Sequence, residues 1–417
     1  MARSRREFLK SVVGTSTVLS LAPALPTFLG RSALAAPRER DTNDTVLVVL
    51  QLSGGNDGLN TVVPYDDDVY GRNRRTLRIT ESQVHRIGSS MGFHPEMKAL
   101  WKLYQEGQLS ILQGVGYPNS NRNHDTALRD WHTASPGDAA CQTGWIGRAV
   151  DSVDRPDQAD VPGVFVGPIA RPFGLNAEKA VVPAIRNLEQ LTLRTAPGST
   201  GSASKKVLDA IQEPSASGNP LVDYVRGSTL AAHASSRQVQ DVLRDADRVG
   251  EYPPFGLADR LKMVAQLVRA KLGIRIFFVE LGGGGIGGFD NHANQRDNHA
   301  ALLRQLSESV AAFVRDVTQA GMLDRVALIT FSEFGRMVTE NGRRGTNHGA
   351  AAPMFLAGGA VRGGLVGEHP SLTDLDQDAQ KPHTDFRRVY ATMIESWLGY
   401  DSKAVLGQEY KPLDLFA

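Results

Sequence analysis

Three short runs of almost uninterrupted apolar residues limit what this chain can fold into. They are TVLVVLQL from Thr45 to Leu52, RIFFVEL from Arg275 to Leu281 and RVALITF from Arg325 to Phe331. A strand with one solvent-facing side alternates apolar and polar residues, whereas these runs are apolar on both sides. Each run therefore predicts a buried strand of a parallel sheet that is covered on both faces.

Amphipathic segments separate these runs and complete the pattern. Helices are predicted at Pro95–Glu106, Asn298–Ala320 and Asp385–Leu398, and further strands at Leu109–Leu112 and Pro353–Leu356. Strands that alternate with helices favour a sheet between two helical layers. The predicted fold class is therefore α/β, with a mostly parallel central sheet flanked by helices on both faces.

The N-terminus is typical of an export signal. Arg5 and Arg6 precede an apolar stretch, Val12–Leu29, and the small residues Ala33-Leu34-Ala35 then offer a cleavage site. The paired arginines resemble a twin-arginine signal, and an ordinary basic signal region is the alternative. We expect residues 1–35 to be a twin-arginine signal peptide, the export machinery to be a partner, and the mature protein to be periplasmic or secreted.

The apolar stretch of the signal is a poor membrane anchor. Pro23 and Pro26 interrupt it, and it is short for a bilayer span. We therefore expect no stable membrane span after cleavage. Residues 36–417 are expected to form a single domain with a mobile, partly helical excursion at about 196–272, because Ser, Gly, Ala and Pro dominate the start of that region.

Composition excludes several classes of function. The formal net charge is only +1, so nothing indicates a nucleic-acid partner. Cys141 is the single cysteine, which excludes an internal disulfide and a thiolate metal cluster. The chain has neither a dinucleotide fingerprint nor a cysteine set for an iron–sulfur cluster, which makes an oxidoreductase a weak hypothesis.

Chemically active residues gather just after the predicted strands. In an open parallel sheet, ligands bind outside the carboxyl ends of the strands. The candidates are Asp57 in SGGNDGLN, the group Arg122, His124 and Thr126, the pair Asp290 and His292, Glu333 in TFSEFGR, and His348 in GTNHG. A tight turn or a solvated polar surface could explain one such cluster, but the combination favours a metal or phosphate-type site.

Asp290, His292 and His348 are the strongest metal-ligand candidates. A carboxylate and an imidazole two residues apart can meet one cation if the backbone between them is extended. His348 follows another strand of the same predicted sheet, so all three can converge. Two imidazoles and a carboxylate suit a divalent metal such as zinc, manganese or iron, and Glu333 and Asp57 would complete or bridge the site.

At these residues the chain resembles a family catalogued as domain of unknown function 1501. The resemblance is carried, in order, by LSGGNDGLNTVVPY, FHPEMKALWKLYQEGQL, NRNHDTALRDWHTA, GFDNHANQ, TFSEFGR and GTNHG. That family is similar to the alkaline phosphatase and sulfatase superfamily. The resemblance implies an alkaline-phosphatase-like fold and a one- or two-metal site that hydrolyses phosphate or sulfate esters.

The resemblance also assigns roles and shows departures. Asp57 corresponds loosely to the carboxylate after the first strand, Asp290 and His292 to ligands, and His348 to the late histidine ligand. Glu333 stands where the superfamily often has an Asp-His pair, but Phe334 follows it here.

The second cluster departs from the family as well. Asn123 replaces a serine that the family often has before the histidine, which leaves Thr126 as the nearest hydroxyl. The catalytic candidates are therefore His124, Thr126 and Arg122.

Two functions follow from these expectations. The first is an exported metal-dependent hydrolase that acts on a small-molecule or surface ester of phosphate or sulfate. The alternative is a non-catalytic exported binding protein that retains the fold with a degenerate active site, which the identities of Asn123 and Phe334 favour.

Overall fold

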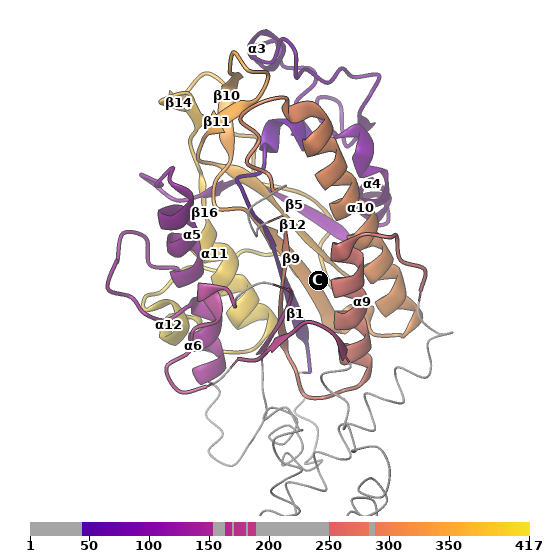
Figure 1. The fold of residues 1–417 in the computed structure, drawn as a ribbon, viewed down its shortest axis with the longest axis vertical. Helices are drawn as coiled ribbons and strands as arrows, with labels where there is room; N and C mark the ends of the chain where they lie inside the picture. Colours follow the sequence, from indigo (N-terminus) through magenta and orange to yellow (C-terminus); the bar gives the residue numbers. More distant parts are fainter. Residues whose placement is uncertain (1–43, 153–162, 169–170, 181, 189–249, 283–287) are drawn as a thin grey trace, which may run out of the picture.

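The computed structural model describes residues 44–152, 163–168, 171–180, 182–188, 250–282 and 288–417 (Figure 1). The predicted signal peptide and residues 196–249 of the predicted excursion lie outside these ranges. Among the described residues, no helix has both the length and the apolar character that a membrane crossing requires.

The three apolar runs form the centre of the main sheet. They are β1 (Val46–Leu52), β8 (Ile276–Leu281) and β9 (Val326–Phe331), and every residue of each strand is buried. β1 pairs in parallel with β8 on one side and with β9 on the other. The prediction of buried parallel strands is therefore confirmed.

The outer strands extend this centre in the order β13-β5-β12-β9-β1-β8-β6-β7, and β16 pairs with β5. Their bounds are β5 (Leu109–Gly116), β6 (Gly163–Val166), β7 (Ala184–Ile185), β12 (Ala352–Gly358), β13 (Gly364–Val366) and β16 (Thr384–Asp385). Within this sheet β12 runs antiparallel to both β5 and β9, whereas the other pairs are parallel. The sheet is thus mostly parallel, as predicted.

Helices cover both faces of the sheet (Figure 1). One layer holds α4 (Lys98–Gln105), α9 (Gly256–Arg269) and α10 (Gln295–Gln319), and the other holds α5 (His124–Thr133), α6 (Trp145–Asp151), α11 (Phe386–Ala391) and α12 (Ser402–Leu406). Successive residues of β1 point to opposite faces, so Val48 and Leu50 pack under the first layer and Leu47 and Val49 under the second. This explains why β1 must be apolar throughout.

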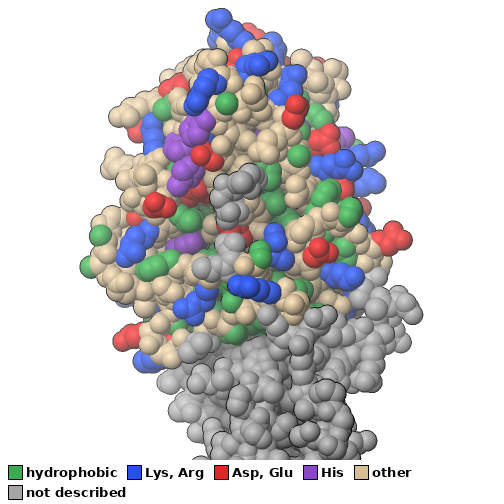
Figure 2. Space-filling view, in the orientation of Figure 1, with side chains coloured by type: hydrophobic (Ala, Val, Ile, Leu, Met, Phe, Trp, Pro, Cys, Tyr) green, Lys and Arg blue, Asp and Glu red, His purple; other side chains and the backbone are tan. Residues whose placement is uncertain are grey.

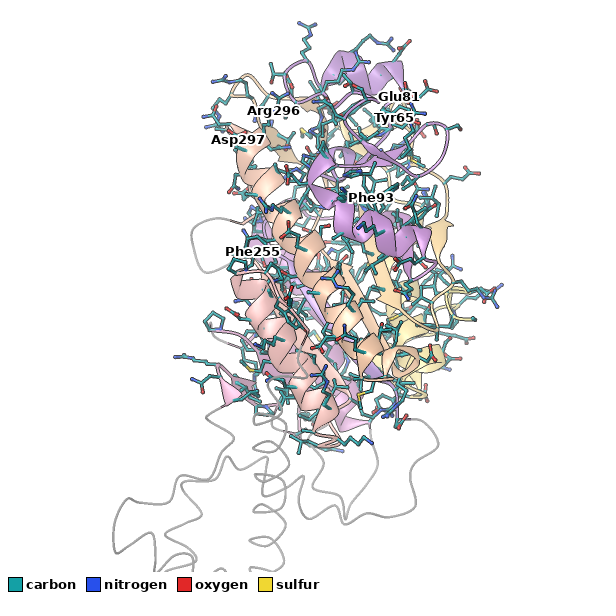
Figure 3. The ribbon with its side chains drawn as sticks, turned by 90° about the vertical axis from the view of Figure 1, so that its right-hand side faces the viewer. Tyr65, Glu81, Phe93, Phe255, Arg296 and Asp297 are labelled. Carbon is teal, nitrogen blue, oxygen red and sulfur yellow. The ribbon has the colours of Figure 1, made fainter. Side chains whose placement is uncertain are left out.

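The predicted helices are found with small shifts at their ends. α10 begins at Gln295, three residues before the predicted start, and a 3-10 turn, Pro95–Met97, precedes α4. α11 continues into a π-helical turn, Thr392–Trp397. α9 falls within the predicted excursion, yet it packs beside α10 and against β8 as part of the main core (Figure 3).

Short elements cap the carboxyl end of the sheet. The most important for function is the hairpin of β10 (Arg336–Glu340) and β11 (Thr346–His348), which places Arg336 directly opposite His348. The others are α3 (Asp68–Asn73), the small sheet of β2 (Val62–Val63), β4 (Gly92–Phe93) and β3 (His85–Arg86), and the pair β14 (Leu375–Asp376) and β15 (Ala379–Gln380).

Candidate metal centre

The carboxyl ends of the central strands bring histidines together from three distant segments. Asp290 and His292 lie in the loop between β8 and α10, His348 ends β11, and His124 is the first residue of α5. The backbone of Asn291 and His292 folds back onto Phe289 and Asp290 through hydrogen bonds of 2.8 and 3.3 Å, so the loop turns and is not extended. Figure 2 shows histidine side chains gathered with an acidic side chain on one face of the molecule.

The carboxylate of Asp290 is the centre of this histidine cluster, which consists of His124, Asp290, His292 and His348. Asp290 Oδ1 lies 2.9 Å from His292 Nε2, 3.1 Å from His348 Nε2 and 3.4 Å from His124 Nε2. The Nε2 atoms of His292 and His348 are 2.8 Å apart. His124, Asp290 and His348 thus each offer a ligand atom, and these three atoms lie within 4.8 Å of one another. His292 Nε2 approaches the same carboxylate from beside them.

The outer nitrogens of two of these imidazoles are held by hydrogen bonds. His348 Nδ1 lies 2.7 Å from the carbonyl oxygen of Arg122, and His124 Nδ1 lies 2.9 Å from Glu333 Oε1. Because a carbonyl or carboxylate oxygen can only accept, Nδ1 carries the hydrogen in both rings. In the neutral ring, Nε2 then presents its lone pair to the cluster, which is the tautomer that a metal ligand needs.

One inner nitrogen lacks the partner that a purely structural cluster would give it. His124 Nε2 is buried and has no hydrogen-bond partner among the described residues. The Nε2 atoms of His292 and His348 are 2.8 Å apart, a distance that requires a proton or a cation between them. The donor set and its unpaired nitrogen therefore fit a divalent cation.

Arg336 offsets the negative charge of Asp290 in the cluster. Its guanidinium is buried and donates to Asp290 Oδ1 at 2.8 Å and to backbone carbonyls that include those of Gly55 and Phe289. Although burial alone would raise the pKa of Asp290, the hydrogen bond and the charge of Arg336 lower it to about 2. The Asp290 carboxylate is therefore ionised at neutral pH and ready to bind a cation.

The surroundings shift the pKa values of His124 and His348 in opposite directions. The hydrogen bond to Glu333 raises the pKa of His124, and burial lowers the pKa of His348. His348 is therefore biased toward the neutral form that binds metals, whereas protons compete more strongly for His124.

Glu333 lies behind His124 rather than within the cluster. Its side chain is buried and also accepts a hydrogen bond of 2.8 Å from the amide of Gly54. This carboxylate–histidine arrangement is the usual way in which proteins fix the orientation of a metal-binding imidazole. The structure thus places the predicted ligand Glu333 in a supporting position.

Asp57 lies outside the histidine cluster. Its two carboxylate oxygens accept hydrogen bonds of 2.5 and 3.0 Å from the guanidinium of Arg74, and Gln295 donates to the same carboxylate at 2.5 Å. Burial alone would raise the pKa of Asp57, but the charge of Arg74 lowers it. Since Asp57 and Arg74 are both fully buried, this pair is an internal ion pair and not a ligand set.

Of the predicted catalytic residues, Arg122 bonds through its side chain to a loop outside the cluster, and Thr126 is exposed. The Arg122 side chain donates to the carbonyl oxygens of Asp376 and Gln377 at 2.7 and 3.2 Å, and only its backbone carbonyl contacts His348. Thr126 is exposed, and its amide donates to Asn123 Oδ1 at 3.2 Å. Asn123 is therefore the N-cap of α5, a position at which serine serves equally well.

Phe334 forms one wall of the histidine cluster. Its ring centroid lies 4.9 Å from that of His124 and 4.5 Å from that of His348. An apolar ring thus occupies the side on which a further ligand after Glu333 would stand.

Sequence reasoning missed two features of this centre. His124 was expected to be catalytic, but its Nε2 points at Asp290 together with those of His292 and His348. Arg336 was not a candidate, although it ends the TFSEFGR motif that contains Glu333. An arginine so close to a candidate ligand was the available signal.

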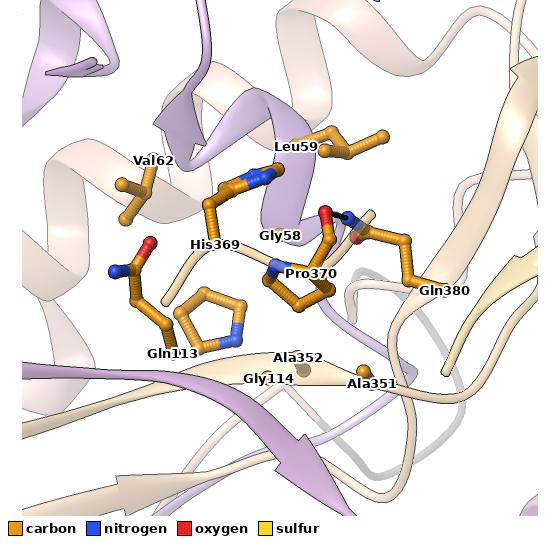
Figure 4. A pocket seen from close by; sticks show the side chains of 11 residues that line it. Gly58, Leu59, Val62, Gln113, Gly114, Ala351, Ala352, His369, Pro370 and Gln380 are labelled. Atoms are coloured by element: carbon orange, nitrogen blue, oxygen red, sulfur yellow. Dashed lines mark hydrogen bonds between the residues drawn. The ribbon is translucent and has the colours of Figure 1, made fainter. Parts of the chain in front are cut away.

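A separate hollow lies beside β5 and β12 (Figure 4). Its walls include Leu59, Gln113, His369 and Gln380, and Gln380 donates to the carbonyl oxygen of Pro370 at 3.0 Å. None of the residues lining this hollow belongs to the histidine cluster. It is therefore not part of the candidate metal centre.

Comparison with protein families identifies relatives of the chain. A family model described as protein of unknown function (DUF1501) matches residues 81–410, which is most of the sequence. The chain belongs to this family. All four residues of the histidine cluster lie in the matched region of this DUF1501 protein, whereas Asp57 precedes it. No curated protein sequence matches the chain significantly.

Several solved structures resemble this DUF1501 protein at low identity. The C-terminal periplasmic domain of EptC from Escherichia coli, in complex with Zn, is 11% identical, with 77% of this chain and 75% of that chain covered and a TM-score of 0.33. The lipoteichoic acid synthase LtaP from Listeria monocytogenes is 9% identical, with 90% and 80% covered and a TM-score of 0.38.

A third similar structure is that of a protein in the alkaline phosphatase superfamily from Vibrio parahaemolyticus. It is 10% identical, with 92% of this chain and 76% of that chain covered and a TM-score of 0.35. At these TM-scores the likenesses say nothing about the metal or substrate of the DUF1501 protein described above.

Proposed function

We propose that this protein is a metal-dependent hydrolase of phosphate or sulfate esters. The observation that carries the proposal is the convergence of His124 Nε2, His292 Nε2 and His348 Nε2 on Asp290 Oδ1, at 2.9 to 3.4 Å. His124, Asp290, His292 and His348 would hold zinc, manganese or iron. A bound divalent ion would polarise an ester oxygen and lower the pKa of a bound water.

The side chains around the histidine cluster prepare it for an anionic substrate. Arg336 offsets the charge of Asp290, so a divalent ion on this cluster keeps a net positive charge toward the ester. Its guanidinium already donates hydrogen bonds to Asp290 and to backbone carbonyls. Arg336 therefore supports the centre and does not bind the substrate directly. Glu333 and the Arg122 carbonyl hold two imidazoles in the metal-binding tautomer.

We further propose that the protein works outside the cytoplasm after twin-arginine export. Arg5-Arg6, the apolar stretch that follows them and Ala33-Leu34-Ala35 support this. A route that carries folded proteins suits a centre whose ligands come from distant segments, because the metal can be bound before export.

A binding protein with the same fold is the second candidate function. Phe334 favours it, because its ring lies 4.9 Å from that of His124 and 4.5 Å from that of His348 and thus provides no ligand on this side. Asn123, which caps α5 in place of a hydroxyl-bearing residue, favours it too.

Metal analysis of the purified protein, joined to an ester assay, separates the two functions. The assay uses 4-nitrophenyl phosphate, bis(4-nitrophenyl) phosphate and 4-nitrophenyl sulfate with zinc, manganese or iron(II). His292→Ala should lose both the metal and hydrolysis, whereas His383→Ala, an exposed histidine outside the cluster, should keep both. Metal binding without hydrolysis of any ester would favour the binding protein, and a wild-type protein that binds no metal would refute the hydrolase.

A further inference from the structure

A column of polar side chains lies on one face of the central strands of the sheet. Gln51 of β1, Glu280 of β8 and His132 of α5 are 3%, 8% and 4% exposed. Ser53, the first residue after β1, stands at the end of the column and is only half-buried. Burying three such groups is unfavourable unless each is hydrogen-bonded, so their partners decide what the column does.

The hydrogen bonds of this column run in one direction. His132 Nε2 lies 2.7 Å from Gln51 Oε1, which can only accept, so this nitrogen carries the hydrogen. Burial lowers the pKa of His132 to about 3, and the ring is neutral at pH 7. The Gln51 amide group then donates to Ser53 Oγ at 2.7 Å.

The hydroxyl of Ser53 donates a hydrogen bond to Glu280. Its oxygen already accepts from Gln51, and its hydroxyl donates to Glu280 Oε1. Burial raises the pKa of the Glu280 carboxyl, which makes its carboxylate a stronger base than one on the surface. A hydroxyl aimed at a carboxylate, with the oxygen oriented from behind, is the arrangement of an activated nucleophile.

The backbone at Ser53 and Gly54 is bonded to residues that adjoin the candidate metal centre. Its carbonyl oxygen accepts a hydrogen bond of 2.8 Å from the amide of Phe289, the neighbour of Asp290. The amide of Gly54 donates at 2.8 Å to Glu333, the carboxylate that holds His124. A Cβ on Gly54 would come within 2.5 Å of the Asp290 backbone nitrogen, so only glycine allows this close approach.

From this arrangement we propose that Ser53 is the nucleophile of the hydrolase and Glu280 its general base. The assignment rests on the proposed function, and it supplies the hydroxyl that neither Asn123 nor the exposed Thr126 provides. Gln51 and His132 hold the Ser53 hydroxyl in place from the buried side.

The step that this pair would perform is a displacement at phosphorus or sulfur. Ser53 Oγ forms a bond to that atom while its proton moves to Glu280, the bond to the ester oxygen breaks, and the departing alkoxide takes a proton from water. In the second step water attacks the same atom, the bond to Ser53 Oγ breaks, and Ser53 regains a proton from Glu280. The first step leaves a hydroxide, and the attacking water of the second step loses a proton. These two combine to water, so the net reaction consumes one water molecule.

Labelling with diisopropyl fluorophosphate tests the pair without relying on ester turnover. Serine attack on this probe forms an oxygen–phosphorus bond and releases fluoride, and peptide mass spectrometry locates the label. We expect the label on Ser53, no label at that position in Ser53→Ala, and labelling slowed by about 100-fold or more in Glu280→Gln. Ser89→Ala, an exposed serine elsewhere, should label like the wild type.

Two results would overturn the assignment. One is a wild-type protein that carries no label on Ser53, and the other is a Glu280→Gln variant that labels at the wild-type rate while its thermal unfolding shows that it is folded.

The ester assay separates this assignment from the proposed function. If the wild type hydrolyses an ester and a folded, metal-loaded Ser53→Ala protein keeps turnover within about twofold, Ser53 is not the nucleophile. A Ser53→Ala rate lowered by about 100-fold or more would support it. If Ser53 is labelled but the metal-loaded wild type hydrolyses no ester, the proposed hydrolase fails while the activated serine stands.

Discussion

Replacing Asp57 with alanine should destabilise the protein without weakening its affinity for metal. Asp57 follows the first strand, and sequence alone makes it a ligand candidate. In the structure its carboxylate oxygens accept hydrogen bonds from Arg74 and Gln295. Asp57→Ala would leave the fully buried guanidinium of Arg74 without its counter-ion.

The structure indicates a large effect on stability. The side chains of Arg74 and Asp57 are 0% and 1% exposed, and removing one partner of such a pair costs about 3–5 kcal/mol. Part of the Arg74 bonding would survive, because its guanidinium also donates to the carbonyl oxygens of Val338 and Met337 at 2.6 and 2.8 Å. We therefore expect a loss of about 3 kcal/mol, at the lower end of that range.

Urea unfolding and metal titration of the same variant test this. The free energy of unfolding should fall by about 3 kcal/mol, whereas metal affinity measured on the folded protein should stay within about threefold of the wild type, because Asp57 contacts no member of the histidine cluster in the structure. His292→Ala is the matched control variant and should give the opposite result. It should lose its affinity for metal and keep nearly the same free energy of unfolding. An Asp57→Ala protein of unchanged stability that no longer binds metal would refute the assignment of Asp57 as an internal ion-pair partner.

Three further outcomes are expected. Burial holds the pKa of His132 at about 3 and that of His299 at about 4, below the ordinary 6.5, so only the unfolded state gains these protons as the pH falls. Stability should therefore decline below pH 6.5, by about 2 kcal/mol per histidine at about pH 5, and a urea midpoint that is equal at pH 7 and 5 would contradict this. Glu333→Gln should weaken metal binding by about 10- to 100-fold in a chelator competition, and an unchanged affinity would remove its supporting role. Replacing Arg5 and Arg6 with lysine should leave a precursor in the cytoplasm on an immunoblot of cell fractions, whereas normal export would exclude the twin-arginine route.

The core of the fold could be predicted because its strands carry an unambiguous pattern. TVLVVLQL is apolar on both faces, and only a sheet covered on both sides buries it fully. The direction of β12 could not be predicted, since the run Pro353–Leu356 is apolar whichever way it pairs. That strand is antiparallel to both neighbours, and the tertiary context alone decides this.

The site was predictable in part for a related reason. Asp290 and His292 follow β8, and the hairpin that holds His348 follows β9, so parallel topology brings both segments to one edge of the sheet. His348 itself ends β11, and the antiparallel pairing of β10 with β11 decides where its ring lies. His124 follows an irregular segment and begins a helix, so its spacing says nothing about where the ring points. In the sequence, Arg74 cannot be told from a surface arginine. Only the fold shows that its guanidinium forms a buried ion pair with the carboxylate of Asp57.

Anomalous X-ray diffraction from crystals of the metal-loaded protein tests the central claim most directly. With zinc, data collected on either side of its absorption edge should show one strong peak at the histidine cluster. We predict that the ion lies about 2.0–2.2 Å from Asp290 Oδ1 and from the Nε2 atoms of His124, His292 and His348. A protein that takes up no ion, or one whose peak lies away from these four side chains, would contradict the account.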